Sequence, residues 1–565
     1  MIAAGARFWL TLICLAAAAQ TAEPPAQPLI GYRGDRNGYY ANCNPPVVWD
    51  EATRKNLVWK TVLPNWCYGL PIVVGKKVFV MSEPGWKSDF PELVCLDLNT
   101  GKILWQKQID HMEQAVSDPR RREQIRAAWA SLLERIRIAF NLVEESAQAG
   151  SDEAKQAKVK EKVAAAFGDR VAAGYYSKGK RFGNQSSAGG YGVLRGWGAG
   201  DTPGPDPKHQ VTLRDLKAAG LRLETFYGFG VAREGECFST PASDGKFVYV
   251  VTEQGSHACF DPDGNLRWLT WIKPTFNPGG HDDSICRSPL VVDGLFITDL
   301  HVDRDTNNKA NVRANPVIAL DCATGKRVWQ APLPWGEGKG LINRDHSCAS
   351  AKVMDVGGAR LFITSGGHVL RVKDGKVLAT IVFSTPQNEI GTDDASDTVF
   401  YIPGAGQGTK KELAAVKLEF QGEALNQKEV WRVPVQGVGY TMAVYQGRVY
   451  TGCEAVEIAT GKVTSWGGGG KGRVPTRWLL AIAGGRLYGL KEDGTATVLD
   501  LTGKVLAVNK VVTATDDPDL IARHLAVDGN RQWEGKRFSY SSPFTFVGNR
   551  ILMRSFDHLY CIGEK

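Results

Sequence analysis

Four of the eleven cysteines in this chain stand at matching places in the sequence, where thiols could do shared chemistry. Cys67, Cys237, Cys286 and Cys348 each come a few residues before an apolar stretch of strand character. Cys67 with Cys237, or Cys286 with Cys348, could form disulfides in an oxidising compartment. Four thiols could also hold a tetrahedral zinc ion, although the Cys-x-x-Cys pairs common in such sites are absent from the sequence. The third alternative is a crowded position that needs a small residue and nothing more.

Polar and aromatic residues gather at the same places, directly before the same apolar stretches. Brought together in a concavity, such carboxylates, histidines, arginines and tryptophans are the usual ingredients of a polar ligand site. Asp282 with Asp283, or Asp393 with Asp394, could bind calcium through their oxygens, and a tryptophan could stack on a planar ring. Adjacent acids in loops also cap turns, so no metal is assigned to them. The candidates are Trp66, Glu236, His281, Asp282, Asp283, Arg344, Asp345, His346, Asp393, Asp394, Tyr440, Arg477, Trp478 and Tyr540.

An internal repeat supplies the elements that position these residues. The stretch Cys95 to Trp105, Cys-Leu-Asp-Leu-Asn-Thr-Gly-Lys-Ile-Leu-Trp, returns at Ala319 to Trp329 as Ala-Leu-Asp-Cys-Ala-Thr-Gly-Lys-Arg-Val-Trp. Each copy predicts a strand, a tight Thr-Gly-Lys turn and a second strand that ends in Trp, which is a hairpin. A recurring unit of this kind predicts an array. Weaker copies are Cys259–Trp268, Val369–Thr380, Val430–Trp431, Ile458–Val463 and Leu499–Val505.

A second repeated pattern comes before most hairpins and brings each unit to four strands. It consists of Ser-Pro or Thr-Pro, an apolar strand, a Gly turn and another apolar strand, as in Thr240–Tyr249, Ser288–Ile297 and Ser542–Ile551. The last unit ends at Ile562 after its third strand, while Asn56–Leu63 looks like a fourth strand without the other three. Pairing the two would close a ring of eight units and leave no open sheet edge.

Alignment of the units predicts where each candidate lies in the ring. The innermost strands should line a central channel, so the residues before them should form the rim of its mouth, with the four cysteines along one arc. Cys95, Cys259 and Cys561 instead share a place in the third strand, where another unit has Ala319. We expect a small buried site there, in which cysteine is an inert apolar residue.

The motif Ala/Cys-x-Asp-x-x-Thr-Gly-Lys-x-x-Trp resembles that of the pyrroloquinoline-quinone-like (PQQ-like) β-propeller superfamily. The superfamily includes quinoprotein alcohol dehydrogenases and the outer-membrane-assembly propeller lipoprotein. The resemblance covers about residues 56 to 109 and 235 to 565. It implies an all-β fold, an eight-bladed β-propeller of four-stranded blades closed by the N-terminal strand.

The resemblance leaves two functions open. In the quinoprotein dehydrogenases it implies a quinone at the funnel mouth, with calcium or a lanthanide, a catalytic Asp and often a disulfide between adjacent cysteines. This chain has neither a Cys-Cys dipeptide nor the Cys-x-x-Cys-His of c-type haem attachment, and no catalytic or cofactor-binding residue can be transferred. The first interpretation is therefore an exported binding or interaction scaffold of unknown ligand. The alternative is a PQQ-dependent dehydrogenase that oxidises an alcohol or sugar, with PQQ and calcium as cofactors.

The N-terminus predicts export. In residues 1–22, Arg7 and the apolar run from Phe8 to Ala19 have the pattern of a secretory signal peptide, and the run is too short to span a bilayer. Cys14 follows the bulky Ile13, which favours cleavage over a lipid anchor. The net charge of +8 comes from interspersed acids and bases, so no nucleic-acid partner is expected. We expect a periplasmic or secreted monomer, without a transmembrane anchor, that binds a protein or glycan.

Residues 110–234 lack the repeat and separate residues 23–109, with the closing strand and the first blade, from the remaining blades in 235–565. Apolar residues at helical spacing predict a helix that Gly150 ends: Ile125, Trp129, Leu132, Ile136, Phe140 and Val143. A second helix is predicted over Glu153 to Phe167, and a third opens with a Thr212/Asp215 capping box and ends at Gly220. Ser177 to Pro207 should be a loop. This insertion could cover the channel mouth, bind a partner or simply pack on the ring.

Overall fold

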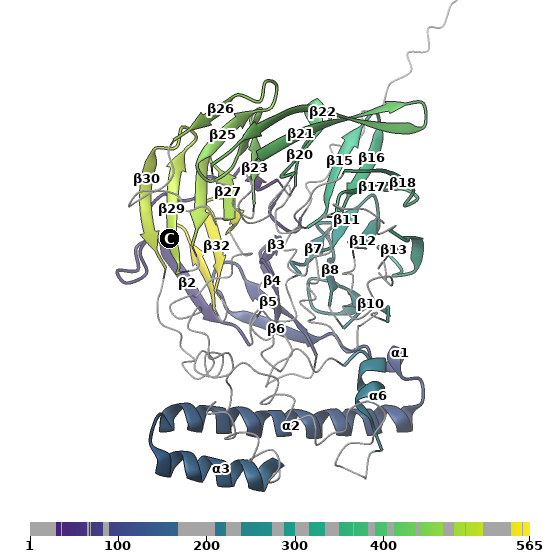
Figure 1. The fold of residues 1–565 in the computed structure, drawn as a ribbon, viewed down its shortest axis with the longest axis vertical. Coiled ribbons are helices and arrows are strands. Elements are labelled where there is room, and N and C mark those ends of the chain that lie inside the picture. Colours follow the sequence, from purple (N-terminus) through teal and green to yellow (C-terminus); the bar gives the residue numbers. More distant parts are fainter. Residues whose placement is uncertain are drawn as a thin grey trace, which may run out of the picture.

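The described strands form eight sheets around a common centre, which confirms the predicted eight-bladed propeller (Figure 1). Seven sheets have four strands, and the eighth has a fifth strand from the N-terminal segment. The computed structural model describes residues 30–34, 37–64, 67, 69–82, 90–167, 210–221, 239–252, 254–273, 288–299, 316–333, 350–364, 366–381, 390–403, 412–436, 441–466, 479–491, 493–511, 544–555 and 558–564.

Blades are numbered here in chain order, and their strands run from the innermost to the outermost. Blade 1 contains β3 (Ile72–Val74), β4 (Lys77–Ser82), β5 (Glu92–Asp97) and β6 (Ile103–Gln108). Blade 2 contains β7 (Ala242–Ser243), β8 (Val248–Val251), β9 (Ser256–Phe260) and β10 (Leu266–Trp271). Blade 3 contains β11 (Leu290–Val292), β12 (Leu295–Asp299), β13 (Val317–Asp321) and β14 (Arg327–Ala331). Blade 4 contains β15 (Lys352–Val356), β16 (Ala359–Ile363), β17 (His368–Arg371) and β18 (Val377–Thr380).

The second half of the ring repeats the same order. Blade 5 contains β19 (Gly391–Asp393), β20 (Thr398–Tyr401), β21 (Glu412–Gln421) and β22 (Ala424–Pro434). Blade 6 contains β23 (Ala443–Tyr445), β24 (Arg448–Tyr450), β25 (Glu454–Glu457) and β26 (Val463–Ser465). Blade 7 contains β27 (Leu479–Ala483), β28 (Arg486–Leu490), β29 (Thr495–Asp500) and β30 (Val505–Lys510). Blade 8 contains β31 (Phe544–Val547), β32 (Arg550–Arg554), β33 (His558–Ile562) and β2 (Leu57–Val62).

The ring closes as predicted, because β2 is the outer strand of blade 8. It pairs antiparallel with β33, with Trp59 opposite Cys561 and Lys60 opposite Tyr560. The pairing joins the front of the chain to its tail and gives the last blade its fourth strand. Neighbouring blades bury the middle strands on both sides, so every residue of β8 and β9 is buried.

The tryptophan of the repeated motif joins each blade to the next. Trp268 in β10 donates its indole N–H to the carbonyl oxygen of Cys322 in blade 3 at 2.8 Å. Gly325, in the turn of blade 3, lies against the same indole with a φ of +68°, and a Cβ there would be 2.5 Å from the Trp268 ring. The motif therefore needs glycine both for the turn and for the close approach. The same contact recurs for Trp59 on Gly101, Trp105 on Gly264, Trp329 on Gly375, Trp431 on Gly461 and Trp466 on Gly503.

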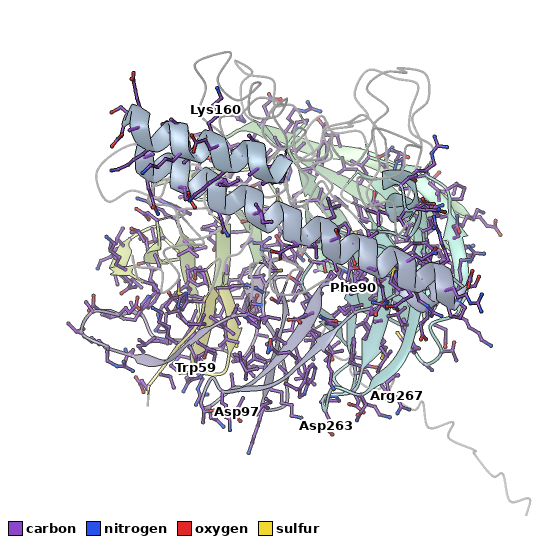
Figure 2. The ribbon with its side chains drawn as sticks, turned by 90° about the horizontal axis from the view of Figure 1, so that it is seen from below. Trp59, Phe90, Asp97, Lys160, Asp263 and Arg267 are labelled. Atoms are coloured by element: carbon purple, nitrogen blue, oxygen red, sulfur yellow. The ribbon has the colours of Figure 1, made fainter. Side chains whose placement is uncertain are left out.

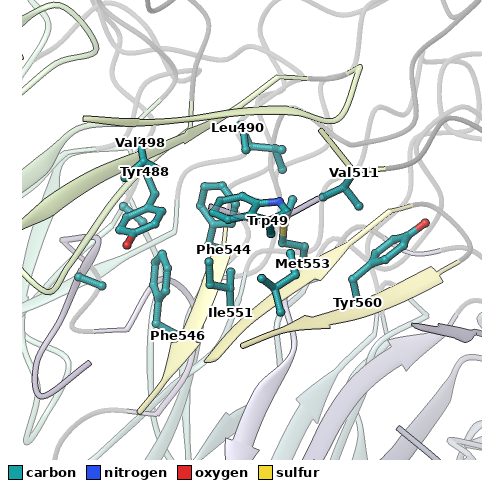
Figure 3. Close-up of a cluster of buried hydrophobic side chains, with 14 of the residues drawn as sticks. Trp49, Tyr488, Leu490, Val498, Val511, Phe544, Phe546, Ile551, Met553 and Tyr560 are labelled. Atoms are coloured by element: carbon teal, nitrogen blue, oxygen red, sulfur yellow. The ribbon is translucent and has the colours of Figure 1, made fainter. Parts of the chain in front are cut away.

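Two joints lack this tryptophan, because neither β18 nor β30 contains one. Between blades 4 and 5, the long β21–β22 hairpin takes its place. Gln427 donates its side-chain amide to the Thr380 oxygen at 3.0 Å, and Phe420 covers Gly357. Between blades 7 and 8, Trp49 fills the gap from the N-terminal segment, among Val511, Phe544 and other buried residues (Figure 3).

The N-terminal segment also crosses the channel, which the repeat analysis did not predict. The oxygen of Ile30 accepts a hydrogen bond from Ser243 in blade 2, and that of Asn37 accepts one from Val444 in blade 6, on the far side of the ring. β1 (Tyr39–Tyr40) then runs parallel to β27 of blade 7. Since Arg33 is buried between these contacts, the chain itself fills this level of the channel.

The insertion is helical where it is described, as predicted. It contains α1 (Met112–Ala115), α2 (Pro119–Ala149), α3 (Glu153–Phe167) and α6 (Leu213–Ala218). Gly150, with a φ of 57°, ends α2. The predicted capping box is present, because the Thr212 hydroxyl donates to Asp215 Oδ2 at 2.7 Å and accepts the Asp215 N–H at 3.2 Å. The α2 and α3 helices lie beside the ring rather than over its centre (Figure 1).

Candidate interaction surface

The insertion leaves the ring on one face, and its position follows from the chain order of the blades. It connects the outer strand of blade 1 to the innermost strand of blade 2. In a four-stranded antiparallel blade, this link and the turn between the second and third strands lie at the same end. Phe90, before β5, and Gln254, before β9, come from such turns, and both contact the insertion or the strand end beside it. We call this the insertion face.

A small apolar core docks the first half of α2 at the insertion face. Ile125, Trp129 and Leu132, three residues of the predicted stripe, are buried with Phe90 and with α1 and α6. Burial of side chains of this size stabilises by about 1.5–3 kcal/mol each. The stripe therefore packs mainly on Phe90 and on the other helices of the insertion. Ile136, Phe140 and Val143 continue the pattern, but their side chains lie outside the described part of the structure.

His111 is the polar centre of this joint. Its Nε2 lies 2.8 Å from the oxygen of Ala219, just after α6, and its ring stacks on Trp271 of blade 2 with centroids 5.5 Å apart. Trp271 in turn donates its indole N–H to the Gln254 oxygen at 2.9 Å. Burial lowers the pKa of His111, while the hydrogen bond to Ala219 opposes that shift. The imidazole is therefore neutral near pH 7, and its N–H ties α6 to blade 2.

Further polar contacts fix the angle at which α2 leaves the ring. Arg126 of α2 pairs with Asp110 at 2.5 Å, and its guanidinium lies over the ring of Phe90, 5.5 Å from the centroid. Gln114 of α1 donates its side-chain amide to the Leu269 oxygen at 2.6 Å. Its side-chain oxygen accepts the backbone N–H of Trp271 at 2.7 Å. Arg126 thus contacts blade 1 through Phe90, and Gln114 joins α1 to the backbone of β10 in blade 2.

Beyond this joint, the described part of the insertion continues as a two-helix hairpin of α2 and α3. We call residues 133–167, the second half of α2 with α3, the distal arm. Among the described residues its two helices contact each other: Gln156 donates to the oxygens of Ser146 and Gly150 at 2.8 and 3.0 Å, and Val159 and Val163 are buried. The outer side of α3 is exposed and carries Lys155, Lys158, Lys160 and Glu161. Figure 2 shows α2 and α3 side by side, with Phe90 near the ring and Lys160 on the outer helix.

Two of the predicted rim residues, Asp393 and Asp394, are described, and the structure corrects their position. Asp393 is the last residue of β19, and Asp394 opens the short 3-10 helix Asp394–Ser396 that leads to β20. Both thus follow the innermost strand, at the end opposite the predicted mouth. The Ser396 hydroxyl donates to Asp393 at 2.5 Å, so this acid caps the turn. The two acids therefore lie apart from the end of the blade at which the rim was predicted, and their part in any ligand site stays a prediction.

Asp394 lies instead in a charged group at the turns of blades 3 to 5. Arg360 donates to both oxygens of Asp355 at 2.8 and 2.9 Å and to Asp293 at 2.5 Å. Partial burial and the neighbouring Asp355 carboxylate raise the pKa of Asp394 to about 6. Arg360 thus balances two of the acids and ties blade 3 to blade 4.

The other rim candidates lie outside the described residues, and their role stays a prediction. They are Trp66, Glu236, His281, Asp282, Asp283, Arg344, Asp345, His346, Tyr440, Arg477, Trp478 and Tyr540.

The proposed thiol arc is described at one member. Cys67 is buried in an apolar cluster between blades 1 and 2, and its sulfur accepts the Gly69 N–H at 3.3 Å. Cys237, Cys286 and Cys348 lie outside the described residues, so both predicted pairings remain predictions. Cys95, Cys259 and Cys561 are buried at one shared position, as the alignment predicts, each opposite the motif tryptophan of its blade.

No helix among the described residues is long and apolar enough to cross a membrane.

Comparisons with known proteins give a family-level match and distant structural similarity. The family model described as outer membrane protein assembly factor BamB matches residues 222–405, which include blades 2 to 4 and two strands of blade 5. Among solved structures, BamB from Moraxella catarrhalis is 12% identical over 56% of this chain and 82% of that chain, with a TM-score of 0.35. The computationally designed Ika8 protein is 10% identical over 58% and 83%, with a TM-score of 0.36. No curated protein matches the sequence.

The repeated hairpin motif, the eight four-stranded blades and the family model agree with one another. This chain is an eight-bladed β-propeller, and its residues 222–405 match the BamB family model.

Proposed function

We propose that this protein is an exported scaffold that binds a protein partner through the distal arm and the adjoining insertion face. The observation that carries the proposal is the docked joint around His111 and Trp129, which holds the arm at a fixed angle to blades 1 and 2. An insertion without a function would not need a buried apolar core that joins it to the ring. A preorganised projection, in contrast, lowers the entropy lost when a partner binds.

The composition of the arm supports a protein partner. α3 exposes small and charged side chains on its outer side, including Ala157, Ala165 and Lys158, so a partner helix or loop can approach closely. The opposite level of the channel is filled by the N-terminal segment, which favours the insertion face as the place of contact. The match to a family described as an assembly factor supports a scaffold role for this chain as well.

The predicted signal peptide and the family model favour the periplasm as the site of action. The description of that family names the outer membrane, which lies at the border of this compartment. Fractionation of the exporting cell with an antibody to the mature chain tests this location. Recovery of the protein in the cytoplasm with an intact N-terminus would contradict it.

Site-specific photo-crosslinking in the exporting cell tests the surface. We place the crosslinking amino acid at Ala157 or Ala165 on the arm, and at Lys102 or Lys326 on the opposite face as matched exposed controls. We expect one discrete protein adduct from the arm positions and none from the controls. Adducts from the controls alone, or no protein adduct from either arm position, would overturn the proposal.

A second variant tests whether the fixed angle matters. Trp129 has the largest side chain of the joint and belongs to α2, outside the ring, so Trp129→Ala empties the joint without changing a blade. We expect the crosslink at Ala157 to fall at least fivefold while the main unfolding transition of the ring stays in place. An unchanged yield would show that the arm binds without its docked joint.

A further inference from the structure

The imidazole of His111 is enclosed by aromatic rings and one backbone oxygen. Its Nε2 lies 2.8 Å from the oxygen of Ala219, and because a carbonyl oxygen only accepts, this nitrogen carries the proton of the neutral ring. One face of the imidazole stacks on Trp271 at an interplanar angle of 3°, and the ring of Phe90 stands perpendicular to it with the centroids 5.5 Å apart. The side chain is fully buried, so the closed joint shields it from water.

The second ring nitrogen makes this enclosure sensitive to charge. Nδ1 of His111 is buried and has no hydrogen-bond partner among the described residues. In the neutral ring this nitrogen presents only a lone pair. In a protonated ring it would present a second N–H with no acceptor in the described structure, and the charge would be cut off from water. The Trp271 face attracts a cation, but the loss of hydration outweighs that attraction, because burial lowers the pKa of His111.

The charged groups around the ring leave this balance in place. Asp110, beside His111 in the chain, favours a cation on the ring and Arg126 of α2 opposes one, and these two residues are paired with each other at 2.5 Å. The blades contribute Phe90 and Trp271 to the contact, and neither side chain titrates. The other described ion pairs of α1, α2 and α6 at this end of the insertion are Glu113 with Arg122 and Asp215 with Arg121.

The same contact holds α6 in the joint. We call residues 210–221 the α6 segment. Ala219 is buried with Trp129 in the apolar core that docks α2. Gly220 lies directly against the imidazole, because a Cβ there would be 2.8 Å from Nε2 of His111. The α6 segment therefore covers the ring, so water and a proton reach His111 only when this segment moves away.

We propose that acidification opens this joint: a proton taken up by His111 releases the α6 segment, and the distal arm loses its fixed angle to the ring. The inference rests on the proposed function, because it makes presentation of the arm to its protein partner depend on pH. The direction follows from linkage. In the open joint His111 binds a proton with the ordinary histidine pKa of about 6.5, whereas the closed joint binds it more weakly. The closed joint is therefore fully favoured above that pH and loses stability below it.

Hydrogen exchange of the purified full chain tests the opening without any partner. The amides of Leu216, Ala219 and Leu221 bond within the α6 segment, and a helix of six residues does not persist once it is undocked. From pH 8 to pH 5, after correction for intrinsic exchange, we expect their protection to fall at least threefold. The limit is about 30-fold, set by a pKa of about 6.5 in the open joint. Amides of β4 should stay within twofold, and unchanged protection of the α6 segment would overturn the proposal.

Three variants show whether the response belongs to His111. Glutamine at this position can still donate to Ala219 but does not titrate, so His111→Gln should keep its protection at both pH values. His368→Gln is the matched control, because His368 is also buried but lies in blade 4, and it should respond like the parent. Gly220→Ala forces a Cβ against the ring and should expose the α6 segment at pH 8 already. A parent-like pH response in His111→Gln, or full protection in Gly220→Ala, would overturn the proposal.

Photo-crosslinking at Ala157 separates this proposal from the function on which it rests. The reaction is run in an extract of the exporting cell at pH 7.5 and at pH 5.5, with and without His111→Gln. We expect the protein adduct of the parent to fall at least twofold at the lower pH and that of His111→Gln to persist. An adduct that ignores pH, or that falls equally in both proteins, would overturn the control by pH and leave the arm as the binding surface. No adduct at either pH would overturn the arm as the binding surface, while hydrogen exchange still decides whether the joint opens.

Discussion

The joint between blades 2 and 3 and the joint between blades 7 and 8 hold the same ring together by different means. At the first, Trp268 comes from the neighbouring blade and its acceptor Cys322 lies 54 residues away. At the second, the wedge is Trp49, whose backbone N–H donates to the Asn509 side chain 460 residues away. A repeat can therefore lack the motif tryptophan when a side chain from a distant segment of the chain fills the space between the two blades.

The two tryptophans also differ in how they bind. The indole N–H of Trp268 has a carbonyl acceptor, whereas that of Trp49 is buried with no partner among the described residues. Trp49 instead contributes apolar contact with Val511, Phe544 and Met553 (Figure 3). The joint of blades 2 and 3 thus combines a hydrogen bond of the indole with buried apolar surface. The joint of blades 7 and 8 depends on the buried apolar surface of the indole.

The largest effect should come from emptying the joint between blades 7 and 8. Trp49→Ala removes a nearly fully buried ring, and such truncations cost about 3–5 kcal/mol. We expect a marked fall in Tm by circular dichroism, with loss of the protection that amides of β30 and β31 show in hydrogen exchange. If both stayed unchanged, the N-terminal segment would not be the wedge of this joint.

A smaller effect should separate two glycines with similar backbones. Gly325 and Gly422 have φ values of +68° and +62°, so alanine strains both by about 1–2 kcal/mol. At Gly325 the new Cβ would also meet the Trp268 ring, whereas at Gly422 nothing lies within 4 Å. We expect Gly325→Ala to cost about 1–3 kcal/mol more than Gly422→Ala in denaturant unfolding. Equal costs would mean that the tryptophan contact gives way freely.

Replacing each tryptophan by phenylalanine should sharpen the comparison further. Trp268→Phe leaves the Cys322 oxygen without its donor, at a cost of about 1–3 kcal/mol. Trp49→Phe removes an N–H that has no acceptor in the described structure, so it should cost less. The measurement is unfolding under reducing conditions, which excludes any effect on cysteine pairing. A larger loss of stability from Trp49→Phe than from Trp268→Phe would show that the indole hydrogen bond does not distinguish the two joints.

The smallest effect concerns pH at the joint of the insertion. Because burial lowers the folded-state pKa of His111, this residue leaves stability unchanged above its unfolded pKa of about 6.5. Below that pH the unfolded chain binds the proton first, so stability falls as the solution is acidified. We expect His111→Gln to lose less stability than the parent between pH 7 and pH 5. Parallel pH profiles would show that His111 does not titrate in this way.

Local sequence patterns were sufficient to predict much of this fold. The Thr-Gly-Lys turn and the tryptophan predicted the hairpins, and the incomplete last unit predicted closure by Asn56–Leu63, where the structure has β2 (Leu57–Val62). Thr212 and Asp215 predicted the start of α6. Each of these features is written within about a dozen residues, so a single sequence contains the whole signal.

Features that depend on contact between distant segments were missed. Residues 30–50 contain no repeat, and nothing local indicates that Asn37 meets Val444 or that Trp49 fills a gap in the ring.

The error at Asp393 and Asp394 has a different cause. The repeated pattern has a glycine turn after its first apolar strand, and blade 5 has no glycine in the turn between β19 and β20. Asp397, with a φ of 54°, takes the left-handed position there. Asp393 and Asp394 belong to this turn, which follows β19, whereas the rim is predicted before the innermost strand. A polar loop at either end of a short strand gives the same sequence pattern.

The order in which the ribosome makes this chain has a consequence for how the ring is completed. β2 (Leu57–Val62), which completes the last blade, is synthesised several hundred residues before its partner β33 (His558–Ile562). At about 5–20 residues per second, roughly half a minute to a minute and a half separates the two during translation. Throughout that interval β2 can contact blade 1 through Trp59 but has no strand partner, so its backbone hydrogen-bonding groups are open to other pairings. A truncation that removes β33 would leave β2 without a strand partner and the ring open, so we expect aggregation rather than a small loss of stability.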